Sequence, residues 1–226
     1  MENNGAGFAG DSKIEGVGTF QGGVYGNLKI DGVCTIEGDI EAESIDVNGV
    51  CTCNGNVSAR IFDCDGVLTI EGNLRAGTID VDGVVTVNGN KIEADRIACD
   101  GVLSVEGEIS ADVIEADGKL NAEEIVGDRI VIKSYWKRGI KGLFTRAGDK
   151  VGVKLSTKAP VIGLAGSMKF STIGLIEGTV VDIRGVRAKS VSGQNVYIGK
   201  NCEIDRVEAG GELEIHKSSV VKEVVS

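Results

Sequence analysis

The sequence predicts an all-β fold: a parallel β-helix, or solenoid, with three short strands in each coil of about 17 residues. Three observations predict it. Glycines recur at spacings of 16 to 18 residues, apolar and polar residues alternate between them, and aromatic residues make up only 4% of the chain. Because so few large rings are available, we expect a narrow interior filled by aliphatic side chains.

Three corners define each coil. The first is a glycine that follows Asp, Asn or Glu and, in six of seven cases, precedes Val: Gly16, Gly32, Gly49, Gly66, Gly83, Gly101 and Gly118. The second is also glycine: Gly38, Gly55, Gly72, Gly89 and Gly107. The third follows a small residue: Ala42, Ala59, Ala76, Ala94 and Ala111. Such glycines mark sharp turns because they accept positive φ, and the three corners leave strands of four to six residues.

Apolar columns lie between the corners at the alternating positions that a strand turns inward. One column holds Cys34, Cys51, Leu68, Val85, Leu103 and Leu120; another holds Ile36, Cys53, Ile70, Val87 and Val105. In the outward column Glu37, Asn54, Glu71, Asn88, Glu106, charge mostly alternates with amide, which limits like-charge stacking. We expect a flexible tail over residues 1–13, about seven coils over 14–132, a basic insert or linker over 133–168, and further coils over 169–226.

The composition argues against several functions. A net charge of −10 disfavours nucleic acid as a partner, and residues 1–13 lack the pattern of a signal peptide, so we expect a cytoplasmic protein. Hexapeptide-type acyltransferases need a catalytic histidine and β-helical carbonic anhydrases need three, whereas this chain has only His216, which we expect at the surface. We therefore predict no catalytic site, no cofactor and no metal.

Six cysteines, without an export signal, are expected to stay reduced. Four of them, Cys34, Cys51, Cys53 and Cys64, fall within two coils and could hold zinc or an iron–sulfur cluster. Aliphatic residues fill the same columns in other coils, however, so we interpret these cysteines as small buried core residues.

The chain after Ile173 resembles the bactofilins, the polymer-forming bacterial cytoskeletal proteins, in the longer form of Gram-positive bacteria. The resemblance is carried by Ile176–Gly178, Val186–Ala188, Val191 and, most specifically, the stretch NVYIGKNCEID followed by Val207 and Glu208. Gly199-Lys200 stands where such proteins often have Gly-Pro. The resemblance implies a right-handed β-helix, nucleotide-independent polymerisation into non-polar filaments, and a cytoplasmic scaffold often found at the membrane. It implies no catalytic residues.

The insert reverses the charge of the chain. Residues 133–158 carry a net charge of +7, which leaves −17 on the remainder. A helix there would place Trp136, Ile140, Leu143 and Phe144 on one face beside basic residues, as in helices that bind anionic lipid. The alternative is a solvated loop. The candidate residues for membrane or partner contact are Trp136, Lys137, Arg138, Ile140, Lys141, Leu143, Phe144 and Arg146.

Both ends of the rod are expected to be open, because the glycine-rich tail is a poor cap and the last residues are themselves strand-like. The candidate polymerisation residues are Phe20, Val24, Leu213, Ile215, Val220, Val221 and Val224. We therefore expect the chain to be its own partner in a homopolymer and to act as a scaffold. The alternative is an ice-binding or other surface-recognition β-helix, because Val and Thr recur on an outward face, as in Val50-x-Thr52. An acyltransferase is the least favoured reading.

Overall fold

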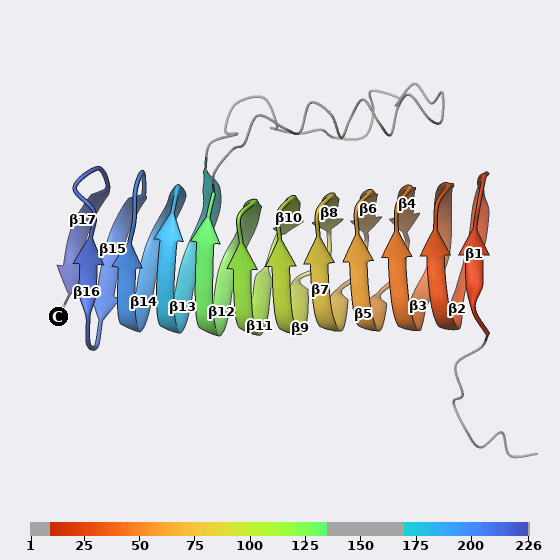
Figure 1. Ribbon diagram of the computed structural model, residues 1–226, viewed down its shortest axis with the longest axis horizontal. Helices are drawn as coiled ribbons and strands as arrows, with labels where there is room; N and C mark the ends of the chain where they lie inside the picture. The colour runs from red at the N-terminus through yellow and green to blue at the C-terminus, as the bar shows by residue number, and fades with distance from the viewer. Residues whose placement is uncertain (1–9, 135–169, 226) are drawn as a thin grey trace, which may run out of the picture.

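The computed structural model describes residues 10–134 and 170–225. Over these residues there is no helix, and every strand belongs to one 17-stranded parallel sheet. The sheet winds into stacked coils that form a rod, from β1 (Ser12–Ile14) at one end to β17 (Val220–Val225) at the other (Figure 1). The predicted β-solenoid is confirmed, with about 11 turns.

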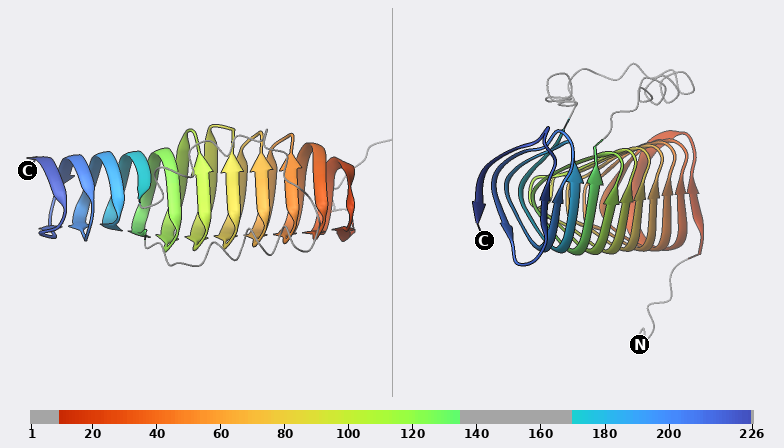
Figure 2. Two further views of the ribbon diagram at one scale, coloured as in Figure 1. Left: turned by 90° about the horizontal axis from the view of Figure 1, so that it is seen from above. Right: turned by 60° about the vertical axis from the view of Figure 1, so that its left-hand side comes forward.

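The strands follow one another along the rod in chain order, so neighbouring coils are neighbours in sequence (Figure 2). After β1 come β2 (Val17–Ile30), β3 (Val33–Val47), β4 (Val50–Cys53), β5 (Val57–Cys64), β6 (Val67–Ile70), β7 (Leu74–Val81), β8 (Val84–Val87) and β9 (Lys91–Cys99). Then come β10 (Val102–Val105), β11 (Glu108–Ala116), β12 (Lys119–Lys133), β13 (Ser171–Arg184), β14 (Val186–Ile198), β15 (Glu203–Ala209) and β16 (Leu213–Ile215).

A coil of the central rod contains one short and one longer strand around the three predicted corners. In the coil that begins with β4, the third corner lies inside β5: the register runs from Ala59↔Ala76 to Ile61↔Thr78 and omits Arg60. Hydrogen bonds to the neighbouring coil resume directly beyond the bend. The corner therefore changes the direction of the strand without ending it.

The predicted inward columns form the core. Side chains from Cys34 to Leu120 in the first column are at most 5% exposed, and those of the second column are at most 6% exposed from Ile36 to Val105. The core is mostly aliphatic, and Phe62 is the largest side chain fully buried in it. All six thiols are buried and free. This agrees with a narrow interior that large rings would overfill.

The predicted positive φ explains only two of the corner glycines, Gly16 and Gly38. Among the described glycines only Gly16, Gly38 and Gly185 have positive φ. At Gly66 a Cβ atom would lie 2.1 Å from the carbonyl oxygen of Gly49 in the neighbouring coil. Close approach between stacked backbones therefore requires glycine at corners such as Gly66, whereas Gly16 and Gly38 have the predicted positive φ and nothing within 4 Å of a Cβ position.

Asx side chains at the second corner link one coil to the next. The backbone N–H of Asn56 donates to Asp39 Oδ1 at 2.7 Å, that of Asn73 to Asn56 Oδ1 at 2.9 Å, and that of Asn90 to Asn73 Oδ1 at 2.9 Å. This ladder follows the predicted glycines by one residue. These side-chain oxygens accept from backbone N–H groups that have no backbone acceptor at the turn.

The coils on either side of the insert form one continuous sheet. β12 and β13 pair in register from Asn121↔Thr172 to Lys133↔Arg184, although many residues separate them in sequence. The chain leaves and re-enters the sheet at one point, where the Ser134 and Ser171 hydroxyls are 2.6 Å apart. Ser171 is fully buried and also accepts from the backbone N–H of Leu120 at 3.0 Å. The rod therefore begins at Ser12 and runs as a single body through Val225.

Candidate assembly surfaces at the ends of the rod

The first coil ends the core at the N-terminal end of the rod with two aromatic rings. Phe20 lies in the inward column of Ile36, and its ring reaches within 3.5 Å of where a Cβ of Gly18 would be. Tyr25 lies similarly against Gly23 and donates its hydroxyl to the carbonyl of Gln21 at 2.8 Å. Both rings are partly buried against the core. Glycine in two inward columns thus makes room for the two rings, which cover the core at this end of the rod.

The last coil ends the core with aliphatic side chains. Leu213 and Ile215 continue the inward columns of Val196 and Ile198, and Val221 and Val224 continue those of Ile204 and Val207. Their partners in the preceding coil are at most 2% exposed. At the end, Val224 is 49% exposed and Ile215 is 38% exposed. These four residues therefore form an apolar layer that no described coil covers.

The other two candidate interface residues lie on the outside of the rod. Val24 pairs with Glu41, and Val220, which is 60% exposed, pairs with Glu203. Both partners are exposed and belong to outward columns. The structure thus divides the candidates into five end-layer residues, Phe20, Leu213, Ile215, Val221 and Val224, and two flanking ones.

The backbone at each end has a free edge within the described chain. Residues Val17 to Tyr25 of β2 pair with β3 alone, and β17 pairs with β15 alone. A strand edge of this kind presents N–H and C=O groups to any strand that can pair with it. A second copy stacked on an end would bury both the apolar layer and the free strand edge.

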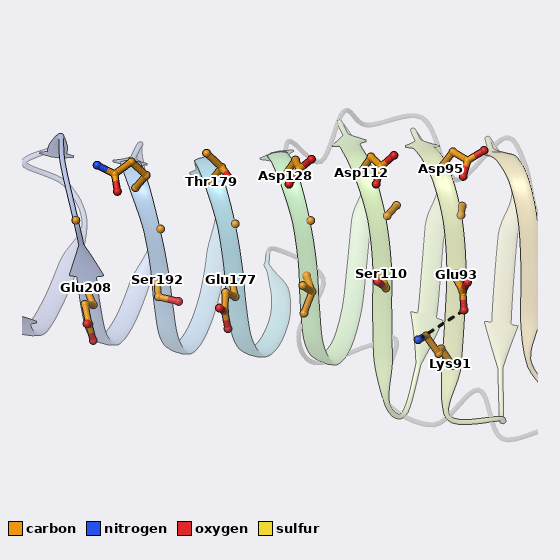
Figure 3. A pocket seen from close by; sticks show the side chains of 18 residues that line it. Lys91, Glu93, Asp95, Ser110, Asp112, Asp128, Glu177, Thr179, Ser192 and Glu208 are labelled. Carbon is orange, nitrogen blue, oxygen red and sulfur yellow. Dashed lines mark ion pairs between the residues drawn. The ribbon is translucent and has the colours of Figure 1, made fainter.

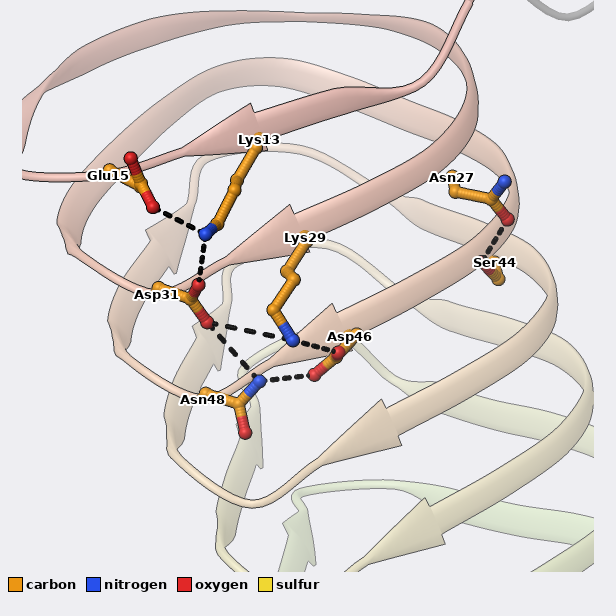
Figure 4. A network of polar contacts seen from close by, with 8 residues as sticks. All are labelled: Lys13, Glu15, Asn27, Lys29, Asp31, Ser44, Asp46 and Asn48. Carbon is orange, nitrogen blue, oxygen red and sulfur yellow. Dashed lines mark hydrogen bonds and ion pairs between the residues drawn. The ribbon is translucent and has the colours of Figure 1, made fainter.

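Charged side chains near the N-terminal end neutralise one another (Figure 4). Lys13 contacts Glu15 and Asp31, and Lys29 contacts Asp31 and, at 2.7 Å, Asp46. The hydrogen bond from Lys13 lowers the pKa of Asp31 below its usual value, and the bond to Asp46 raises the pKa of Lys29. The first coils are therefore joined by ion pairs on one side.

On the same side of the rod, the central coils carry a row of aspartates. Asp46, Asp63 and Asp80 are register partners, and Asp65 and Asp82 lie beside them at the first corner. None of Asp63, Asp65, Asp80 and Asp82 has an ion pair within the described residues. Burial raises the pKa of Asp63, and the carboxylates around it raise it further; Asp82 is affected in the same way. In another outward column, amides alternate with carboxylates as predicted. The side-chain amide of Asn54 donates to Glu37, and that of Asn88 donates to Glu71.

The Val–Thr face predicted from the repeat is present. Val33, Val50, Val67, Val84 and Val102 are successive register partners, as are Thr35, Thr52, Thr69, Thr86 and Ser104. Most of these side chains are half-buried. The ladder therefore forms one regular face of the rod between the first and second corners.

An open groove of about 970 Å³ runs along the third corner (Figure 3). Small residues such as Ala111 and Gly127 are among those that line it, and Asp95, Asp112 and Asp128 lie in a row along one side. Lys91 pairs with Glu93 near one end. The residues that line the groove include no histidine and no cysteine, so it lacks a nucleophile–base pair of that kind.

The only histidine of the sequence lies at the C-terminal end of the rod. His216 lies in the turn between β16 and β17, where its Nδ1 accepts from the backbone N–H of Ser218 at 3.1 Å. Within residues 10–134 and 170–225, no three His, Cys, Asp or Glu side chains are arranged to hold a metal ion. In the same part of the chain, no helix is long and apolar enough to cross a bilayer.

The candidate membrane-contact residues, from Trp136 to Arg146, lie outside the described residues. Comparison of the sequence and structure with protein-family models, curated proteins and solved structures found no match. The geometry and chemistry of the chain itself are therefore the basis for any functional conclusion.

Proposed function

We propose that this protein is a structural scaffold that assembles end to end into filaments without nucleotide or metal. The observation that carries the proposal is the apolar layer of Leu213, Ile215, Val221 and Val224 at a free strand edge. Stacking a second copy there would remove apolar surface from water and pair the exposed backbone groups. The acidic sides of the rod would stay in water, which limits uncontrolled lateral aggregation.

Two features support a structural role over catalysis. The buried interior is mostly aliphatic, and the groove of Figure 3 is lined by carboxylates and one lysine that is already ion-paired with Glu93. The resemblance to bactofilins implies the same role. Electron microscopy of the purified full-length protein, in buffer with a chelator and no nucleotide, tests the proposal. Filaments about one rod wide are expected, and isolated rods would contradict it.

The Val–Thr face supports a second candidate, recognition of a regular surface such as ice. Its side chains repeat at the strand spacing of about 4.8 Å over five coils. A thermal-hysteresis measurement distinguishes the two. The scaffold proposal expects none, whereas a clear freezing-point gap that disappears in Thr69→Lys would favour surface recognition.

Membrane attachment through the basic insert stays a prediction from the sequence. Attraction between a segment of net charge +7 and anionic lipid would be screened by salt. Co-sedimentation with acidic vesicles that is lost at high salt is expected. Equal sedimentation with neutral vesicles, or none with either, would contradict it.

A further inference from the structure

The six buried thiols differ in what lies beside them. Cys34 of β3 and Cys51 of β4 are direct register partners, so each thiol has the other as its neighbour in the adjacent coil. The register partners of Cys53, Cys64 and Cys99 are aliphatic instead: Ile36 and Ile70, Val47 and Val81, and Val81 and Ala116. The Cys34–Cys51 pair is therefore distinct from the thiols that only fill the core.

The geometry of this pair suits a covalent bond. The two Sγ atoms are 2.8 Å apart. Register partners in adjacent parallel strands have Cα atoms about 4.8 Å apart, which falls within the range of about 4.4–6.8 Å that disulfides span. Both side chains point into the same interior column. A disulfide could thus form without moving either strand to a new register.

The pair also lies close to one end of the rod. The partner of Cys34 on its other side is Gly18, in the first coil, which has no side chain to cover the sulfur. The Phe20 ring lies against Gly18 and covers this position. Terminal coils open locally at a lower free energy than the whole fold, so opening of the first coil would give a small oxidant access to Cys34. Cys64 and Cys99 lie under further coils.

We propose that Cys34 and Cys51 are a redox site that forms a reversible disulfide between the second and third coils. The oxidant would be a low-molecular-weight disulfide of the glutathione class. The Cys34 thiolate attacks one sulfur of the oxidant, its S–S bond breaks, and one thiol leaves. The Cys51 thiolate then attacks the Cys34 sulfur and releases the second thiol. Two electrons pass to the oxidant, and the two protons of Cys34 and Cys51 end on the released thiols.

The electrostatics of the pair favour this order. The hydrogen bond between the two thiols lowers the pKa of Cys34 and raises that of Cys51. Because the thiolate is the nucleophile, Cys34 is the thiol that attacks first. It is also the one nearer the end of the rod. Closing the 17-residue loop would restrain the first coils against opening.

The test uses the reduced full-length protein, incubated under native conditions with oxidised glutathione, then freed of oxidant, alkylated in denaturant, digested and mapped by mass spectrometry. We expect two of the six thiols to be lost to alkylation, a linked peptide pair containing Cys34 and Cys51, and full reversal by dithiothreitol. Cys53→Val is the matched control, because Val87 and Val105 already occupy that column; it should form the same link.

Cys51→Val should abolish the link and leave at most a glutathione adduct on Cys34, since Leu68 and Val85 show that the column accepts aliphatic residues. A urea-denatured sample shows how the thiols pair when the fold does not direct them. Six thiols that are all still alkylatable when the natively oxidised protein is unfolded would overturn the proposal. So would a native pattern of links as mixed as that of the denatured chain. Neither outcome depends on whether the rods assemble.

Discussion

The two ends of the rod finish the same core in different ways. At the N-terminal end, Phe20 and Tyr25 lie against glycines, and the tyrosine hydroxyl is hydrogen-bonded. At the C-terminal end no ring of the described residues covers the core: Leu213 and Val221 are partly buried against it, whereas Ile215 and Val224 are 38% and 49% exposed. The ion pairs of Lys13 and Lys29 join the first coils, whereas the last coil has one ion pair, Lys222–Asp205, in the described chain.

The difference indicates that the ends contribute unequally to assembly. A ring that covers the layer beneath it already buries much of that surface within its own chain. Uncovered aliphatic side chains bury theirs only when another molecule arrives, so the C-terminal layer has more apolar surface to gain from contact. We therefore expect substitutions in the last coil to have the larger effect on filaments.

The largest expected effect is the loss of filaments in Val221→Lys. The side chain of Val221 lies in an inward column, so a stacked coil would bury the ammonium without a partner at a cost of several kcal/mol. Val220→Lys is the matched control, because Val220 lies next in the chain but points outward beside Glu203. Electron microscopy should show filaments for the control alone. Equal assembly by both variants would show that the end layer is not part of the assembly interface.

A smaller effect, on the free energy of unfolding, is expected when a glycine of an interior coil or of the first coil is replaced by alanine. Gly66→Ala should lower the free energy of unfolding by about 3 kcal/mol, because the new Cβ meets the Gly49 carbonyl in the next coil. Gly18→Ala should change it by less than about 0.5 kcal/mol, since its nearest neighbour is the Phe20 ring at an ordinary contact distance. Urea denaturation followed by circular dichroism measures both. A tolerated Gly66→Ala would show that the coils can separate slightly.

The smallest effect is expected from pH. The raised pKa of Asp63 means that this group favours the folded state when protonated, a contribution lost as the pH rises through its folded value. Asp63→Asn should therefore raise the free energy of unfolding at pH 7 by less than about 1 kcal/mol, with no gain below pH 3.8.

Asp31 should behave in the opposite way. Lys13 lowers the pKa of Asp31 in the folded protein. The contribution of Asp31 to stability is therefore present above pH 3.8 and is lost as the pH falls through its folded-state pKa. Asp31→Asn should be slightly destabilising at pH 7. Unfolding titrations at both pH values measure the two variants, and a change of the same sign in both would contradict the assigned environments.

The repeat made most of the fold predictable from the sequence. The glycine spacing and the alternating columns located the coils and the core because each position recurs about every 17 residues. Positive φ was predicted correctly for Gly16 and Gly38, but the cause of the other corner glycines was not predictable, since contact between Gly66 and Gly49 depends on how closely two backbones stack. The ladder of Asp39, Asn56 and Asn73 was missed for the same reason: its hydrogen bonds join different coils.

The candidate assembly surfaces were predictable only in part. Apolar residues near the ends were recognised, but the inward or outward direction of Val220 and Val221 follows from the register of β17 with β15. The covering rings were also missed, because Gly18 and Gly23 break the column pattern. Two glycines in columns that are otherwise apolar, each two residues before an aromatic residue, are the signal that could have revealed them.

Sedimentation velocity of the wild-type protein over a range of concentrations measures end-to-end assembly itself. We expect a series of species that lengthens with concentration at micromolar protein and physiological salt, without nucleotide or metal. Mass action requires this growth because each added rod buries one more end layer. A single species of 23.5 kDa across the whole range would contradict the claim.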